Sequence, residues 1–108
     1  MKRAAGMMWI WECRKEMGFM NGLIYFFLPG CPFCRQAQEY WAELEREEPK
    51  YAGIQAVKIN ERAQADLADR FDYWLVPCFF LNGRKLHEGA ADKAQIRAVL
   101  DQALSELL

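Results

Sequence analysis

The sequence predicts a single α/β domain in which helices flank a mixed four-stranded sheet, with an additional helix at the N-terminus. Three observations support this fold class. The 108 residues, of which 53% are hydrophobic, are enough for one domain with a real core and too few for two. Apolar runs alternate with segments of helical periodicity, which is typical of a sheet between helices. Finally, Asn82-Gly83 separates two strand-like segments and indicates an antiparallel hairpin.

The expected order of elements is α-β-α-β-α-β-β-α, beginning with a helix over about Met8–Met17. We expect this helix, within residues 1–21, to pack on a domain formed by residues 22–108. The apolar run Leu23–Leu28 does not alternate, which predicts a strand covered on both faces. Pro29-Gly30 ends that strand, and a helix follows from Pro32 to Glu48. Its predicted apolar stripe consists of Phe33, Ala37, Tyr40, Trp41 and Leu44.

The second half of the chain continues the alternation. Ile54–Ile59 predicts a strand, and Asn60 is expected to cap a third helix that carries Ala63, Leu67 and Phe71 at a spacing of four. The strands Cys78–Leu81 and Lys85–His87 flank the Asn-Gly turn. An amphipathic helix over about Asp92–Leu107 closes the chain.

Composition excludes several classes of protein. With 14 Lys+Arg against 15 Asp+Glu and no block of like charge, the chain lacks a nucleic-acid-binding footprint. Its one histidine, His87, excludes a His-rich metal site, and four cysteines are too few for a disulfide-stapled mini-protein. The uncharged run Met17–Cys34 approaches the length of a membrane helix, but glycines and prolines break it. We therefore expect no membrane association and a cytoplasmic location, where thiols stay reduced.

The motif Cys31-Pro32-Phe33-Cys34 lies at the predicted junction of a strand and a helix. Free N–H groups and the positive dipole end of the helix favour an anionic sulfur at Cys31, and Arg35 adds a nearby positive charge. Cys34 lies one helical turn later on the same face, close enough to form a disulfide. This arrangement predicts that Cys31 attacks a substrate disulfide and that Cys34 resolves the mixed disulfide.

Simpler interpretations exist for the same residues. The Cys31–Cys34 pair could be half of a zinc site or two ordinary thiols, although the sequence has no second Cys-x-x-Cys. Pro77 could simply begin a strand. We expect Cys78 and Cys13 to be small buried core residues.

Two motifs resemble the glutaredoxins, within the thioredoxin superfamily. Pro29–Cys34 is similar to their Cys-Pro-aromatic-Cys site, and Val76–Lys85 is similar to their Val-Pro-x-hydrophobic-Phe-x-Asn-Gly hairpin. The resemblance covers about Leu23–Leu107 and implies a thioredoxin fold. It also implies that Pro77 is a cis-proline that faces the two thiols. The Val76 backbone would then pair with a substrate as a short added strand.

The chain departs from the family pattern at several positions that bear on substrate. Glutaredoxins usually carry a Lys or Arg shortly before the motif, where this chain has Phe27–Gly30, and Phe33 lacks the tyrosine hydroxyl. The family's Gly-Gly appears as Gly89-Ala90, with Asp92 following, and this segment could still offer N–H groups to a glutathione carboxylate. Thioredoxins have a buried carboxylate where this chain has Tyr25. The substrate-binding residues expected from the resemblance are Pro32, Phe33, Arg35, Val76, Pro77, Gly89, Ala90 and Asp92.

The resemblance implies a monomeric thiol–disulfide oxidoreductase that reduces protein disulfides or glutathione mixed disulfides. It would need no tightly bound cofactor or metal, with glutathione as a co-substrate and with glutathione or a reductase as the electron donor. The alternative is a binding module in which the Cys31 sulfur and glutathione hold a 2Fe–2S cluster between two protomers. Proline in the motif usually hinders that arrangement. An absorbance spectrum of anaerobically purified protein distinguishes a cluster from a colourless dithiol.

Overall fold

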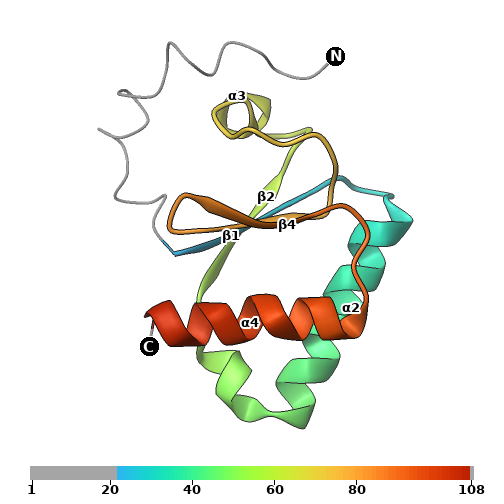
Figure 1. The fold of residues 1–108 in the computed structure, drawn as a ribbon. Helices are drawn as coiled ribbons and strands as arrows, with labels where there is room; N and C mark the ends of the chain where they lie inside the picture. The colour runs from blue at the N-terminus through green and yellow to red at the C-terminus, as the bar shows by residue number, and fades with distance from the viewer. Residues whose placement is uncertain (1–21, 108) are drawn as a thin grey trace.

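The structure, a computed structural model, describes residues 22–107 (Figure 1). The predicted helix Met8–Met17, Cys13 and the expected packing of residues 1–21 lie outside the described residues. The elements are β1 (Leu23–Phe27), α2 (Pro32–Glu47), the 3-10 helix η3 (Pro49–Gly53), β2 (Ala56–Asn60), α3 (Ala65–Ala68), β3 (Cys78–Leu81), β4 (Arg84–Glu88) and α4 (Lys93–Leu107). None of the helices in this part of the chain is long and apolar enough to span a membrane.

The four strands form one mixed sheet in the order β2-β1-β3-β4. β1 pairs in parallel with β2 and antiparallel with β3, and β3 pairs antiparallel with β4. Helices α2 and α4 cover one face of the sheet, and α3 lies on the other (Figure 1). Because β1 is central and covered on both faces, its run of apolar residues needs no alternation. The predicted mixed α/β sheet is confirmed.

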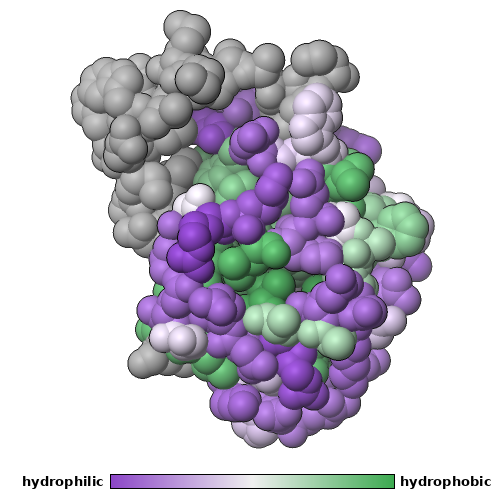
Figure 2. All heavy atoms as spheres, viewed as in Figure 1, coloured by the Kyte–Doolittle hydropathy of each residue, from purple (hydrophilic) through white to green (hydrophobic). Residues whose placement is uncertain are grey.

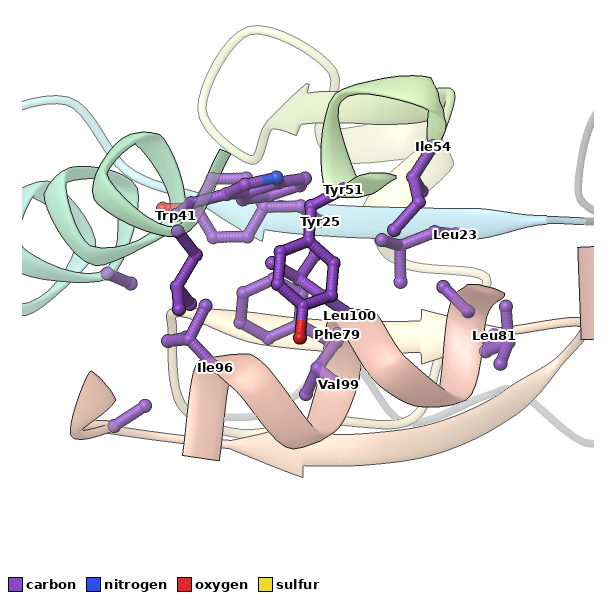
Figure 3. Close-up of a cluster of buried hydrophobic side chains, with 14 residues drawn as sticks. Leu23, Tyr25, Trp41, Tyr51, Ile54, Phe79, Leu81, Ile96, Val99 and Leu100 are labelled. Atoms are coloured by element: carbon purple, nitrogen blue, oxygen red, sulfur yellow. The ribbon is translucent and has the colours of Figure 1, made fainter. Parts of the chain in front are cut away.

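The face covered by α2 and α4 contains the larger core cluster, with Tyr25 near its centre (Figure 3). The Tyr25 ring centroid lies 5.0 Å from that of Phe79 and 5.6 Å from that of Trp41. Ile96 and Leu100 of α4 complete the packing and are fully buried. A tyrosine in this position brings a hydroxyl group into the core beneath the first turn of α2, where it reaches the Cys34 carbonyl.

A smaller cluster on the opposite face is mainly aromatic. We call Phe26, Phe71, Tyr73 and Phe80 the aromatic cluster. The Phe26 ring centroid lies 4.8 Å from that of Phe71, 4.7 Å from that of Tyr73 and 5.8 Å from that of Phe80. Phe26 thus connects the central strand to the segment that leads into Pro77.

The Asn82-Gly83 turn is as predicted. Both residues have positive φ, at 50° and 87°, as a two-residue hairpin of this kind requires. The Asn82 side chain also accepts the Gly22 N–H at 2.7 Å, and the Asn82 N–H donates to the Gly22 carbonyl at 3.0 Å. The hairpin is therefore joined to the beginning of β1.

The predicted third helix is wrong in length and in its cap. The Asn60 side-chain oxygen accepts the N–H groups of Arg62 and Ala63, which closes a turn and does not begin a helix. Only Ala65–Ala68 are helical, with Gln64 as the N-cap. Phe71 is nevertheless buried, because it packs in the aromatic cluster beyond the helix.

The apolar stripe of α2 also differs from the prediction at its first residue. Its buried residues are Cys34, Ala37, Trp41 and Leu44, whereas Phe33 is 54% exposed. Pro49 ends α2 as predicted but also begins η3, which the sequence pattern does not indicate. The Phe33 ring is therefore available at the surface beside the two thiols.

Candidate active site

Cys31 lies between the end of β1 and the beginning of α2. Gly30 has a φ of 78°, which allows the chain to turn tightly after Pro29. Cys31 is the N-cap of α2, and its Sγ accepts the Cys34 N–H at 3.2 Å. Pro32 occupies the first helical turn and is exposed. A helix N-terminus with an N–H directed at the sulfur is an environment suited to an anion.

Cys34 has the opposite environment. The residue is 1% exposed, whereas Cys31 is half-buried. Burial, and then a hydrogen bond with Cys31, raise the pKa of the Cys34 thiol to about 12. Neither cysteine is in a disulfide. The reduced pair thus presents one accessible sulfur and keeps a protonated thiol behind it.

The Tyr25 hydroxyl and the Gln38 amide form a small polar group under Cys34. The hydroxyl donates to the Cys34 carbonyl at 3.0 Å and accepts from Gln38 Nε2 at 3.2 Å. Burial raises the pKa of Tyr25, so the hydroxyl remains a hydrogen-bond donor at neutral pH. Burial dominates the pKa of Cys34, and the neighbouring Tyr25 side chain acts in the opposite direction, toward a lower pKa of that thiol.

The Val76–Pro77 peptide bond is cis. In the β1–β3 register Phe26 lies opposite Cys78, so Pro77 and Val76 continue beside the end of β1 that leads to Cys31. Pro77 is buried and Val76 is half-buried. The residues just before them, Trp74 and Leu75, are 64% and 59% exposed. Two segments far apart in sequence therefore meet at the same end of the sheet.

A cavity of about 200 Å³ lies beside the thiols. Its lining consists of Phe27, Leu28, Pro29, Gly30, Cys31, Cys34, Arg35 and Gln38. Arg35 is the one charged side chain in that lining. A second cavity, of about 260 Å³, shares no residue with the first and lies between β4 and α4, where hydrophobic residues are visible in Figure 2.

Two N–H groups of the segment expected to bind a glutathione carboxylate, those of Gly89 and Asp92, are used within the chain. The Gly89 N–H donates to the Pro77 carbonyl at 2.8 Å. The Asp92 N–H donates to the Gln95 side chain at 2.9 Å, and an Asp92 carboxylate oxygen accepts the Gln95 N–H at 2.8 Å. This reciprocal pair caps α4. Ala90 and Asp92 are exposed.

Sequence reasoning missed two residues of this region, Gln38 and Glu88. Gln38 interacts with Tyr25, thirteen positions earlier, and Glu88 binds the loop before Pro77, more than ten positions earlier. Both residues read as ordinary polar positions on exposed surfaces, and no motif distinguishes them. The contacts depend on which elements become neighbours.

No family model matches this chain, and no curated protein matches it in sequence. Solved structures share its fold. A thioredoxin of Malassezia sympodialis is 19% identical with a TM-score of 0.61, over 83% of this chain and 87% of that one. A Schistosoma mansoni thioredoxin is 19% identical with a TM-score of 0.54, over 95% and 94% of the two chains. Glutaredoxin 2 of Chlamydomonas reinhardtii is 21% identical with a TM-score of 0.50, over 100% and 94%. The mixed sheet, its flanking helices and these likenesses together identify the thioredoxin fold.

Proposed function

We propose that this protein is a dithiol–disulfide oxidoreductase in which Cys31 is the nucleophile and Cys34 the resolving thiol. One observation carries the proposal. The half-buried Cys31 sulfur caps α2 and accepts the Cys34 N–H, while the Cys34 thiol is buried one turn behind it. An accessible sulfur paired with a protected one is the arrangement that sequential thiol–disulfide exchange requires.

The reaction follows in two exchanges. The Cys31 thiolate attacks one sulfur of the substrate disulfide, so that a Cys31–substrate bond forms and the other substrate sulfur leaves as a thiolate and takes up a proton. Cys34 then loses its proton and attacks Cys31 Sγ, which forms the Cys31–Cys34 disulfide and releases the second substrate thiol. Two electrons pass from the protein to the substrate. A thiol donor, either glutathione or a reductase, returns them by the reverse exchange.

In the reduced protein the Tyr25 hydroxyl donates to the Cys34 carbonyl, and we propose that it turns to the Cys34 sulfur and assists the second exchange once that sulfur becomes a thiolate. Replacing Tyr25 by Phe is expected to slow the attack of Cys34 about tenfold, since a hydrogen bond to a charged group contributes roughly 1.5 kcal/mol. In the unmodified protein the rate of this step should rise about tenfold per pH unit through the neutral range. Burial, the largest cause, raises the pKa of the Cys34 thiol well above neutrality, so its thiolate fraction grows by that factor for each pH unit in this range.

Rapid-mixing measurements of mixed-disulfide decay test this prediction. Tyr51→Phe is the matched control, because Tyr51 is also fully buried but donates its hydroxyl to Asp101 at 2.6 Å. The control should leave the rate of the second exchange unchanged. Equal slowing in both variants would contradict a specific role for Tyr25.

The preferred substrate in this proposal is a protein disulfide. Phe33, Trp74 and Leu75 are large exposed apolar residues near the proposed site, and the cavity wall is mainly apolar. Glutathione carries two carboxylates that need cationic or N–H partners. Arg35 is the one charged group in the cavity lining, and the Gly89 and Asp92 N–H groups are already bonded. A peptide can instead pair with the Val76 backbone and bury apolar surface.

Steady-state kinetics with both substrates tests the proposed function. We expect a higher kcat/KM on a protein disulfide than on a small glutathione mixed disulfide. The opposite preference, if it is lost on Asp92→Ala, would identify residues 89–92 as a glutathione site and overturn this choice of substrate. Because both thiols and the Val76–Pro77 segment belong to one chain, we propose that the monomer is sufficient for activity.

A further inference from the structure

Glu88, at the end of β4, binds the backbone of the loop that precedes Pro77. Its Oε2 accepts the N–H groups of two consecutive residues, Trp74 and Leu75, the latter at 2.8 Å. Lys85 Nζ donates to Glu88 Oε1 at 2.8 Å and to the Asp72 carbonyl at 3.3 Å. One carboxylate and its lysine partner thus bind the loop at three backbone positions.

The electrostatics of Glu88 keep this contact intact at physiological pH. Its side chain is 20% exposed, and burial alone would raise its pKa. The hydrogen bonds from Lys85 and from the two backbone N–H groups outweigh burial and lower the pKa to about 2. The carboxylate is therefore ionised above about pH 3, and hydrogen bonds to a charged acceptor are the stronger kind.

The next residue, Gly89, supports the same loop. Its N–H donates to the Pro77 carbonyl at 2.8 Å, and its φ of 94° favours glycine. A Cβ atom at this position would lie 3.4 Å from Leu75 Cδ1, an ordinary contact distance, so the backbone conformation and not crowding favours glycine here. Glu88 and Gly89 together contact the loop from Trp74 to Pro77.

We infer that Glu88 is a positioning residue that fixes the Trp74–Val76 loop for recognition of an extended peptide disulfide. The inference rests on the proposed function and adds a determinant of its specificity. Because the carboxylate binds the Trp74 and Leu75 N–H groups, a peptide strand is limited to pairing at Val76. The same contacts hold the Trp74 and Leu75 side chains at the surface, where they provide apolar area for the peptide.

Kinetics of Glu88 variants on two substrates tests this role. Substrate one is a ten-residue peptide with a disulfide, and substrate two is 2-hydroxyethyl disulfide, which is too small to reach the loop. Glu88→Ala should raise the KM for the peptide about tenfold, the scale of one lost hydrogen bond to a charged acceptor, with kcat little changed. Glu88→Gln should have a smaller effect, since its amide oxygen can still accept an N–H. Neither variant should alter the kinetics on the small disulfide.

Glu106→Gln is the matched control. Glu106 also pairs with a hairpin cation, Arg84, at 2.5 Å, and hydrogen bonds from Arg84, Gln102 and Asn82 lower its pKa to about 2. It joins β4 to α4, however, and does not contact the loop. The Glu106→Gln variant should therefore have the same KM for the peptide as the unmodified protein. An unchanged KM in Glu88→Ala, an equal loss on both substrates, or the same loss in Glu106→Gln would each overturn the inference.

Amide hydrogen exchange separates this inference from the proposed function. If the unmodified protein reduces neither substrate, the proposed function fails, but the contact itself remains measurable. The Trp74 and Leu75 N–H groups should exchange faster in Glu88→Ala than in the unmodified protein and in Glu106→Gln. Equal protection in all three proteins would overturn the positioning role.

Discussion

Replacing Cys31 by Ser is expected to lower the rate of substrate disulfide reduction to background, whereas Cys34→Ser should trap a mixed disulfide. A serine hydroxyl stays protonated at neutral pH and cannot form a disulfide, so the first exchange is lost in Cys31→Ser. In Cys34→Ser the first exchange still occurs, but no internal thiol resolves the product. Some glutathione-linked turnover should remain, because glutathione can release the substrate from outside. Mass spectrometry of acid-quenched reactions measures the trapped species.

Cys78→Ala is the control for the two active-site variants. Cys78 is fully buried on the opposite face of the sheet, in the core with Phe26 and Ile24. The Cys78→Ala variant should still reduce the substrate disulfide. In the native protein the Cys78 thiol should be alkylated last. Alkylation at mildly acidic pH should label Cys31 before Cys34. The reverse order would show that the roles of nucleophile and resolving thiol have been exchanged.

The largest effect on stability is expected at Phe26. Phe26 is fully buried and contacts Phe71, Tyr73 and Phe80 of the aromatic cluster. Truncation to Ala removes those contacts and leaves a cavity between the central strand and the segment before Pro77. The free energy of unfolding should fall by about 3–5 kcal/mol. Urea denaturation, with the m-value compared between variants, measures the change.

Phe33→Ala is the matched control for this loss of an aromatic ring. Phe33 is 54% exposed at the beginning of α2, so its removal should change the free energy of unfolding by no more than about 0.5 kcal/mol. A loss as large as that in Phe26→Ala would contradict the exposed position. A drop in activity on protein disulfides without a loss of stability would instead agree with contact between Phe33 and the substrate.

The parts that sequence predicted correctly depend on local chemistry. A run of apolar residues without alternation predicts a strand that is covered on both faces, and β1 is the central strand. Asn82-Gly83 supplies positive φ at both turn positions, so the hairpin requires no distant contact. The Cys31–Cys34 spacing and Pro32 place the two sulfurs at a helix N-terminus by helical geometry alone.

Tertiary structure determined several features that the local sequence pattern did not predict. The Asn60 side chain closes a turn where the sequence pattern predicted the beginning of a helix. Phe71 is buried because it packs against Phe26, although it does not lie on a helix. Phe33 is at the surface because α2 turns Cys34 and Ala37 toward the sheet. Glu88 and Gln38 acquire their roles from the strand register and from helix packing, which bring them to partners more than ten residues away. Hydrophobic periodicity can be read directly from a single sequence. Contacts between residues far apart in sequence form only when the sheet and its helices pack together around the core.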